Sequence, residues 1–474
     1  MRIVRQINHS QRGIAAAALF LLAGAVCQLD AQNPGMLSGI NPVGQNPHGL
    51  QLYNVTGFAG WTSMASPQQG LILPSNGTLG SDTTIGGGAS LGWATGGERT
   101  KFAIRYSGGY NGEFRYTQWN AFYHFLSMTL SRKLTPKFTV NLSAASAVSN
   151  YNQLLFSPTT FGSLVAAPGD FQDLSSAVLS GQYNNDQLAS LLTGAPIIDS
   201  PSRTVFFGNR VFTSSGAITL SYAKTPRLSF GFTADYGYEQ HLADTNSNAP
   251  QTSFLLPHAS YGMAGLSVSY ALSPRTQIGA GTSSGRSFSG IQQSYTNSAS
   301  IFVGHEINDH WFMQVNAGAG FASNVHAQPT LSTLGARPTF GAKLGYRTFA
   351  NTFMATYERM LTLAYGAGAS DTTMYGGGWR WWRPGHTWGM SASGGDEILH
   401  NMAFSKVSGY RGTFGINKQL GTHAMVEAGY SYGAYSGGLL NTIPSPEPVG
   451  APLKSHQHTV RLTLAWYPQS LEKQ

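Results

Sequence analysis

The sequence has little charge, almost no cysteine and, after its first thirty residues, no long apolar run. Charged residues make up only 10% of its 474 residues, against about a quarter in an ordinary globular chain. The 58 glycines and the 12% of aromatic residues are abundant by comparison. A soluble protein of this size would carry more surface charge, so the composition favours one large sheet over several soluble domains.

The missing apolar runs exclude membrane-spanning helices. Beyond the N-terminal segment, no stretch of eighteen or more apolar residues occurs, and a helical span needs about twenty. If this chain crosses a bilayer, it must do so with strands.

The first thirty residues have the pattern of a signal peptide, in which three arginines precede a short apolar run at 14–26. Small residues offer two cleavage sites, after Ala25 or after Ala31. We favour the second site, because it leaves a polar stretch before the cut. We therefore expect a signal peptide at 1–31 and a short periplasmic segment at 32–48.

Cysteine occurs once, as Cys27 within this leader. Val26 precedes it where a lipidated cysteine needs a small residue, which argues against a lipoprotein. The mature chain then has neither disulfides nor a cysteine-ligated metal, and we expect no cofactor. Cleavage after Ala31 removes three arginines and one aspartate and leaves a net charge of +6. Because no basic tract accompanies this mild excess, we expect no nucleic-acid partner.

Alternation with period two dominates the rest of the sequence and predicts strands. At 137–144 the apolar Phe138, Val140 and Leu142 alternate with polar or small residues. The segments 228–236, 313–320 and 460–466 repeat the pattern. The segment 351–365 resists it, because Arg359 falls on the apolar face, and we expect a bulge or an end effect there.

Short turns recur along the chain and set the expected strand count. We identify eight, at 95–100, 134–137, 224–227, 272–275, 308–310, 348–351, 383–386 and 419–422. Eight turns join sixteen strands, and one further strand at each end, near 50–61 and 456–467, makes eighteen. The opposite connections read as longer and rich in glycine, serine and asparagine.

Two architectures produce such strands, a soluble sandwich and a membrane barrel. Short turns on one rim and long loops on the other favour the barrel. We therefore predict an all-β, antiparallel up-and-down transmembrane barrel at 49–468, of about eighteen strands with sixteen as the alternative, a loop insertion at 150–205 and a tail at 469–474. Aromatic residues at the short-turn ends suit a membrane boundary: Tyr222, Tyr270, Trp311, Tyr346, Trp388, Trp466 and Tyr467.

These features together resemble the porin-type outer-membrane barrels of diderm bacteria, over roughly residues 49–468. The resemblance is architectural and points to no specific family. The last strand, 456–467, is similar to the aromatic-ended strand that the barrel-assembly machinery recognises, although residues 468–474 follow its aromatics. The resemblance implies outer-membrane lipid, lipopolysaccharide and the assembly machinery as partners, and leaves the oligomeric state open.

The alternation assigns several charged residues to the lumen face, and these are the main candidates for function. The set is Lys101, Arg105, Lys343, Arg347, Arg380, Arg411 and Arg461 against Asp235, Glu306 and Glu427. Seven basic residues against three acidic ones favour a mildly anion-preferring lumen. The alternative is that these charges pair across strands and hold the wall.

The insertion at 150–205 is the third long loop by strand count. In many porins the third loop narrows the barrel, so we expect a constriction here, with an exposed or partner-binding loop as the alternative.

The sequence gives only weak indications of a catalytic site. His124 with Ser127, and His305 beside Glu306, are the nearest to a hydrolase constellation, and neighbouring strand residues point to opposite faces. The chain is not expected to be an enzyme. We interpret His456 and His458 as a strand end and not a metal site, and the glycines at 376–378 as a strand in which side chains must be small and not a phosphate site.

The leading functional hypothesis is an outer-membrane channel for passive diffusion of small polar solutes. An export conduit for a polysaccharide or other polymer is the alternative, for which Phe302 and Trp382 on polar-facing positions are a slight hint. A structural or adhesive barrel with a plugged lumen and a membrane-embedded hydrolase complete the set.

Overall fold

The computed structural model describes residues 49–63, 80–97, 99–115, 117, 120–150, 210–242, 258–289, 293–325, 335–348, 350–364, 368–382, 387–401, 404–439 and 453–468. The expected signal peptide at 1–31, the segment at 32–48, residues 151–205 of the insertion and the tail at 469–474 lie outside these ranges. The expected constriction loop therefore lies outside the described residues.

Eighteen strands form one antiparallel sheet. The first nine are β1 (Gly49–Thr62), β2 (Asp82–Gly96), β3 (Thr100–Glu113), β4 (Ala121–Thr135), β5 (Phe138–Asn150), β6 (Arg210–Ala223), β7 (Leu228–His241), β8 (His258–Ser273) and β9 (Thr276–Ser289). The second nine are β10 (Gln293–Glu306), β11 (Trp311–Val325), β12 (Gly335–Arg347), β13 (Asn351–Ala364), β14 (Gly368–Trp382), β15 (Trp388–Asn401), β16 (Phe404–Leu420), β17 (Ala424–Leu439) and β18 (Leu453–Trp466).

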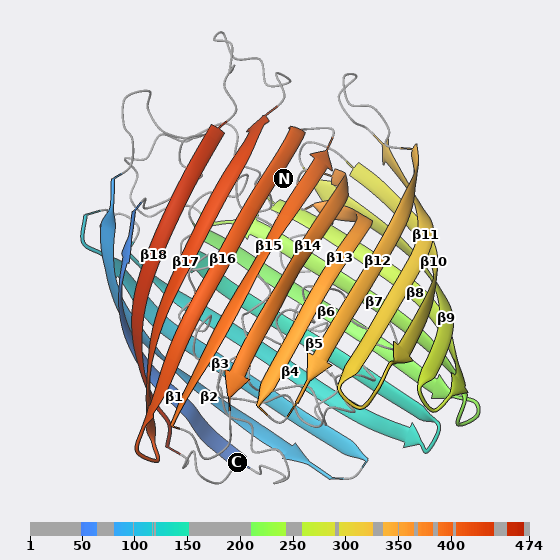
Figure 1. The fold of residues 1–474 in the computed structure, drawn as a ribbon, viewed down its shortest axis with the longest axis horizontal. Helices are drawn as coiled ribbons and strands as arrows, with labels where there is room; N and C mark the ends of the chain where they lie inside the picture. The colour runs from blue at the N-terminus through green and yellow to red at the C-terminus, as the bar shows by residue number, and fades with distance from the viewer. Residues whose placement is uncertain are drawn as a thin grey trace, which may run out of the picture.

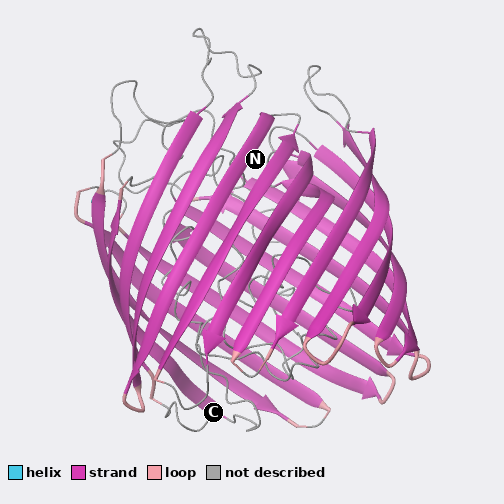
Figure 2. Cartoon of the chain, viewed as in Figure 1, coloured by secondary structure: helices cyan, strands magenta, loops and turns pink. Residues whose placement is uncertain are grey.

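The sheet closes on itself. Each strand pairs with its neighbours in sequence, and β1 also pairs with β18, from Val55 opposite Trp466 to Thr62 opposite Thr459. Figure 1 shows the tilted strands wrapped into a barrel, with the red β18 beside the blue β1. Strands make up nearly all of the described chain (Figure 2), and no helix within it is long and apolar enough to span a membrane. The prediction of an eighteen-strand barrel is confirmed, and the sixteen-strand alternative is not.

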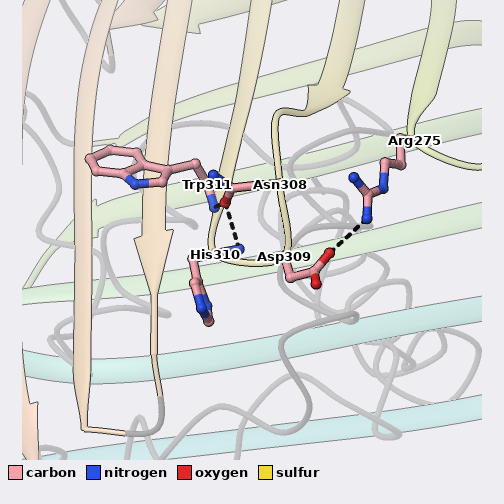
Figure 3. A network of polar contacts seen from close by, with 5 residues as sticks. All are labelled: Arg275, Asn308, Asp309, His310 and Trp311. Atoms are coloured by element: carbon pink, nitrogen blue, oxygen red, sulfur yellow. Dashed lines mark hydrogen bonds and ion pairs between the residues drawn. The ribbon is translucent and has the colours of Figure 1, made fainter.

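Short hairpin turns join the strands at one rim, and the β10 to β11 turn shows how side chains shape one. The Asn308 carboxamide oxygen accepts hydrogen bonds from the backbone N–H groups of His310 and Trp311, both at 2.9 Å (Figure 3). This Asx-type turn satisfies groups that the ladder leaves open. Asp309 forms a 2.7 Å ion pair with Arg275 of the neighbouring turn (Figure 3).

Two expectations about the strands need correction. The connections on the other rim are not uniformly long, because β10 begins at Gln293 soon after β9 ends at Ser289, and β16 at Phe404 soon after β15 ends at Asn401. The bulge expected at 351–365 is absent, since β13 pairs with β14 in continuous register from Asn351 to Ala364. The wall keeps its alternation through Arg359.

Close packing of aromatic rings on glycines holds neighbouring strands together inside the barrel. Phe312 of β11 lies directly opposite Gly345 of β12, and its ring fills the space that a side chain at Gly345 would need. Phe302 of β10 covers Gly279 of β9 in the same way. Glycine is required at both positions because of this close approach.

Candidate functional site: the lumen wall

The two faces of each strand are distinguished by burial. On β18, Val460, Leu462 and Leu464 are 50 to 55% exposed, whereas Arg461 and Thr463 between them are 5% and 2% exposed. Exposed aliphatic side chains in such a row form a surface for lipid, and the alternate residues must face the lumen. The register then assigns every other strand, because directly paired residues share a face.

Seven of the ten charged residues expected in the lumen have described side chains, and all seven face it. They are Asp235 on β7, Glu306 on β10, Lys343 and Arg347 on β12, Arg380 on β14, Glu427 on β17 and Arg461 on β18. The strands that carry Lys101, Arg105 and Arg411 are described, but the side chains of these three residues lie outside the description.

Two of the arginines stand in one cross-strand row. Arg347 pairs with Thr352 of β13, and Thr352 pairs in turn with Arg380. The two arginines are therefore two strands apart on the same face, about 10 Å between their backbones. Both side chains form interactions within the fold. Their like charges repel each other, so this row forms a positive patch on the lumen wall.

An acidic residue that sequence reasoning missed lies on β13, six residues along the strand from Thr352. Glu358 of β13 faces the lumen, is 9% exposed and attracts Lys343 electrostatically. It was missed because Arg359 made the register of 351–365 look unreliable. Strict alternation from Thr352 would have found it.

A further charged cluster lies where β16, β17 and β18 meet. Asn417, Glu427 and Thr463 face one another across the three strands and are 1 to 2% exposed. The guanidinium of Arg461 lies 3.6 Å from the centre of the Phe58 ring and interacts electrostatically with Glu427. The lumen charges on this side of the barrel are thus enclosed by protein.

The opposite wall, on β6 to β9, is lined by small polar side chains. Hydroxyl pairs bridge its strands, with 2.6 Å between the Oγ atoms of Ser229 and Ser269. Lumen-facing Met263 is 41% exposed, and Thr233 and Ser267 are exposed as well. Asp235 is the predicted lumen charge on this wall, and Glu239 of the same strand also faces the lumen but is only 4% exposed. The accessible part of the wall is therefore the part around Thr233, Met263 and Ser267.

The candidate catalytic groupings do not assemble. His124 lies on the outer face of β4, where its Nδ1 is 2.7 Å from the Tyr106 hydroxyl, whereas Ser127 faces the lumen. His305 faces outward beside Thr276, and Glu306 faces inward. The described residues contain no group of three or more His, Cys, Asp and Glu that could hold a metal ion. Gly376, Gly377 and Gly378 lie within β14, as a strand reading of this run implies.

Aromatic residues mark the end of the outer apolar surface at the short-turn rim. Tyr222, Tyr270, Trp311, Tyr346, Trp388 and Trp466 all lie on the outer face near the turns. Tyr467 does not belong to this group. It follows Trp466, so it faces the lumen, where it is fully buried against Met425 and Ala465. Burial raises the pKa of the Tyr467 phenol above its ordinary range.

A second girdle, which sequence reasoning did not find, lies near the opposite ends of the strands. Outward Tyr110 and Phe122 have ring centroids 5.0 Å apart, Tyr410 and Tyr432 are 6.1 Å apart, and Arg286 lies 4.7 Å from the Tyr295 ring. An apolar band between two aromatic girdles on a closed sheet is the architecture of a transmembrane barrel of the outer membrane. The chain is therefore an outer-membrane β-barrel protein of the porin-like architectural class.

Comparison with known proteins adds similarity in shape. No protein-family model and no curated protein sequence matches the chain. Among solved structures, it is similar to OccAB2 of Acinetobacter baumannii, with 9% identity over 89% of this chain and 98% of that one and a TM-score of 0.42. A BenF-like porin of Pseudomonas fluorescens Pf-5 gives 11% identity, the same coverages and a TM-score of 0.42. The siderophore receptor PirA of A. baumannii gives 7% identity over 90% of this chain and 81% of that one, at 0.39.

Proposed function

We propose that the protein is an outer-membrane channel through which small polar solutes diffuse passively. The observation that supports this most directly is the lumen wall of β6 to β9, where Thr233, Met263 and Ser267 are exposed. A barrel of eighteen strands encloses more space than side chains alone can fill. Small hydroxyl side chains suit a water-filled path, because they offer hydrogen bonds without blocking it.

Liposome swelling tests the open path. Vesicles containing the purified barrel are expected to swell in small sugars, with a rate that falls as the sugar becomes larger. Replacing Ser267 with tryptophan should lower the rate for every sugar, because the indole would project into the accessible side. The same change at exposed Leu266, on the lipid face of β8, serves as the control. Swelling no faster than in protein-free vesicles would contradict the channel.

We also propose a mild preference for anions, which the row of Arg347 and Arg380 supports. One unit charge about 10 Å from a permeant ion in water contributes about 0.4 kcal/mol, which is roughly a twofold effect. This charge favours an anion and disfavours a cation by that amount, so replacing Arg380 with glutamine should lower the anion-to-cation permeability ratio about fourfold. Asp235→Asn should raise it, because Asp235 lies on the accessible wall.

Reversal potentials in salt gradients, recorded from single channels, measure this ratio. Arg132→Gln is the control, since Arg132 lies exposed on the outer face of β4. A reversal potential of cation-selective sign in the unaltered barrel would overturn the anion preference while leaving the channel itself intact. Glu358, close to Lys343, and the lumen-facing Glu113 of β3 and Glu239 of β7 carry the negative charge that would explain such a result.

A plugged structural barrel is the second candidate, and the burial of the charged wall favours it. Lys343, Arg380, Glu427 and Arg461 face the lumen yet are 2 to 7% exposed. If the enclosure extends across the whole lumen, single-channel recordings will show no conductance and liposomes will not swell. A barrel that passes salt but excludes the smallest sugar would be a narrow channel.

The polymer-export alternative loses one of its two supports. Phe302 faces the lumen as expected, but it is 8% exposed and packs on Gly279, so it offers no open ring for a sugar. The side chain of Trp382 lies outside the description. For the channel, we also propose that it has no catalytic activity. We further propose that the barrel-assembly machinery recognises β18 and delivers the protein to the membrane.

A further inference from the structure

The outer face of β18 changes character along its length. Trp466, Leu464, Leu462 and Val460 are exposed in succession from the short-turn end. The next two outward residues are His458 and His456, which are exposed as well. The apolar band on this strand therefore ends at Val460, and two imidazoles follow it.

The position of these histidines matches a membrane boundary. Ten residues separate His456 from Trp466, and at about 3.4 Å per residue they span roughly 34 Å along the strand. A tilt of about 40° reduces this to roughly 26 Å along the membrane normal, close to the apolar height of about 25 Å in such barrels. Trp466 marks the periplasmic boundary, so His456 lies at the level of the outer-leaflet headgroups and His458 lies about 5 Å below it.

Tyrosines on the neighbouring strand fix both rings. The Tyr430 hydroxyl is 2.8 Å from Nδ1 of His458, and the Tyr432 hydroxyl is 3.0 Å from Nδ1 of His456. The Tyr432 ring stacks on His456 at 6.3 Å and lies 5.0 Å from His458. When each tyrosine donates to Nδ1, the imidazole proton is on Nε2. Neither Nε2 has a hydrogen-bond partner among the described residues.

The surroundings suit an amphipathic anion. Tyr410 extends the aromatic surface on one side, and Trp61 of β1, opposite Val460, extends it on the other. Asp396 of β15 is the carboxylate nearby on this face, and it accepts a 2.5 Å hydrogen bond from the Tyr375 hydroxyl. Two imidazole N–H groups thus stand at or just below the headgroup level with rings around them and apolar surface beneath.

We propose that the outer face of β16, β17 and β18 binds the phosphate-bearing headgroup of an outer-leaflet glycolipid, with Nε2–H of His456 and His458 as the donors. Phosphate oxygens accept charge-assisted hydrogen bonds, which are stronger than neutral ones. The acyl chains of the same lipid would lie along Val460, Leu462 and Leu464. This apolar continuation favours a lipid over a free phosphate ion.

The test measures binding of lipid A with both phosphates to the full-length barrel in detergent, through the rise in its thermal unfolding midpoint. Loss of a hydrogen bond to a charged group weakens binding by roughly tenfold or more. The double variant His456→Gln and His458→Gln should therefore bind lipid A at least about tenfold more weakly. Dephosphorylated lipid A should bind the unaltered barrel as weakly as intact lipid A binds the variant.

His124→Gln provides a matched control, because His124 is also outward and bonded to a tyrosine hydroxyl. Its affinity for lipid A should equal that of the unaltered barrel. Equal binding by the double variant would overturn the proposal, as would an equal loss in His124→Gln, which would make binding a property of the whole girdle. A midpoint shift with inorganic phosphate alone would identify an ion site in place of a lipid site. Migration of unheated protein on gels verifies that each variant is folded.

Discussion

Replacing Gly345 with alanine is expected to destabilise the barrel by about 2 to 3 kcal/mol, because overpacking of a filled interior costs energy on this scale. The Phe312 ring occupies the volume that the new methyl group would need, and Phe312 is 1% exposed. The two residues are directly paired, so neither strand can shift without breaking the ladder between β11 and β12. The ring must leave its place, and the interior contacts that it makes are lost.

Urea unfolding from lipid vesicles, followed by tryptophan fluorescence, measures this change as a lower midpoint at constant slope. Gly433→Ala is the control, because the space around Gly433 on β17 is open to a distance of 4 Å. It should change stability by only a few tenths of a kcal/mol. If Gly345→Ala unfolds at the same midpoint as Gly433→Ala, the ring and the glycine do not lock these strands together.

The second large effect is expected at Arg359. Its guanidinium contacts Asp371 on the outer face through two hydrogen bonds, of 3.2 Å from Nε and 2.8 Å from a terminal nitrogen. Arg359→Leu leaves the Asp371 carboxylate, whose side chain is 9% exposed, without this partner beside lipid. Removing one member of a buried pair costs about 3 to 5 kcal/mol. We expect about 3 kcal/mol, because the Arg359 side chain is itself 33% exposed.

A double-mutant cycle separates the pair from its surroundings. Arg359→Leu with Asp371→Leu should recover most of the stability lost in the single variant, since no uncompensated charge then faces the membrane. The same unfolding experiment applies. A double variant as unstable as Arg359→Leu alone would show that Asp371 contributes through contacts other than the ion pair.

Arg359 also shows where sequence reasoning reached its limit. Alternation predicted the strands because each side chain in a barrel wall meets either lipid or lumen, and residues such as Val460, Arg461 and Leu462 follow that rule. An arginine on the lipid face breaks it. Its partner Asp371 lies on the next strand, twelve residues away, and becomes visible only when the register of both strands is known. The irregular residue was real, and of the two causes expected for it, a bulge or an end effect, the bulge was wrong.

For the lumen wall and the outer girdles too, some features follow from the sequence pattern and others require the three-dimensional structure. The orientation of Lys343 or Arg461 follows from its position in its own strand, so the sequence predicted it correctly. The burial of these side chains depends on what lies against them in three dimensions, which alternation does not encode. We assigned Tyr467 to the outer girdle because it is an aromatic residue at the end of a strand. It directly follows the outward Trp466, so alternation places it on the lumen face. The histidines at 456 and 458 were read as a strand end, and their tyrosine partners come from another strand.

The seam between β1 and β18 has a consequence for how the chain acquires its structure. Every other strand pair joins neighbours in sequence, but this ladder joins residues about 400 positions apart, such as Val55 and Trp466. Contacts between residues so far apart in sequence form late, because closing the long loop between them costs chain entropy before the contacts can stabilise it. Until then β1 presents an unpaired edge that can pair with other chains. Closure of this seam is therefore expected to come last in folding, and a chain truncated before β18 should aggregate through β1 instead of inserting.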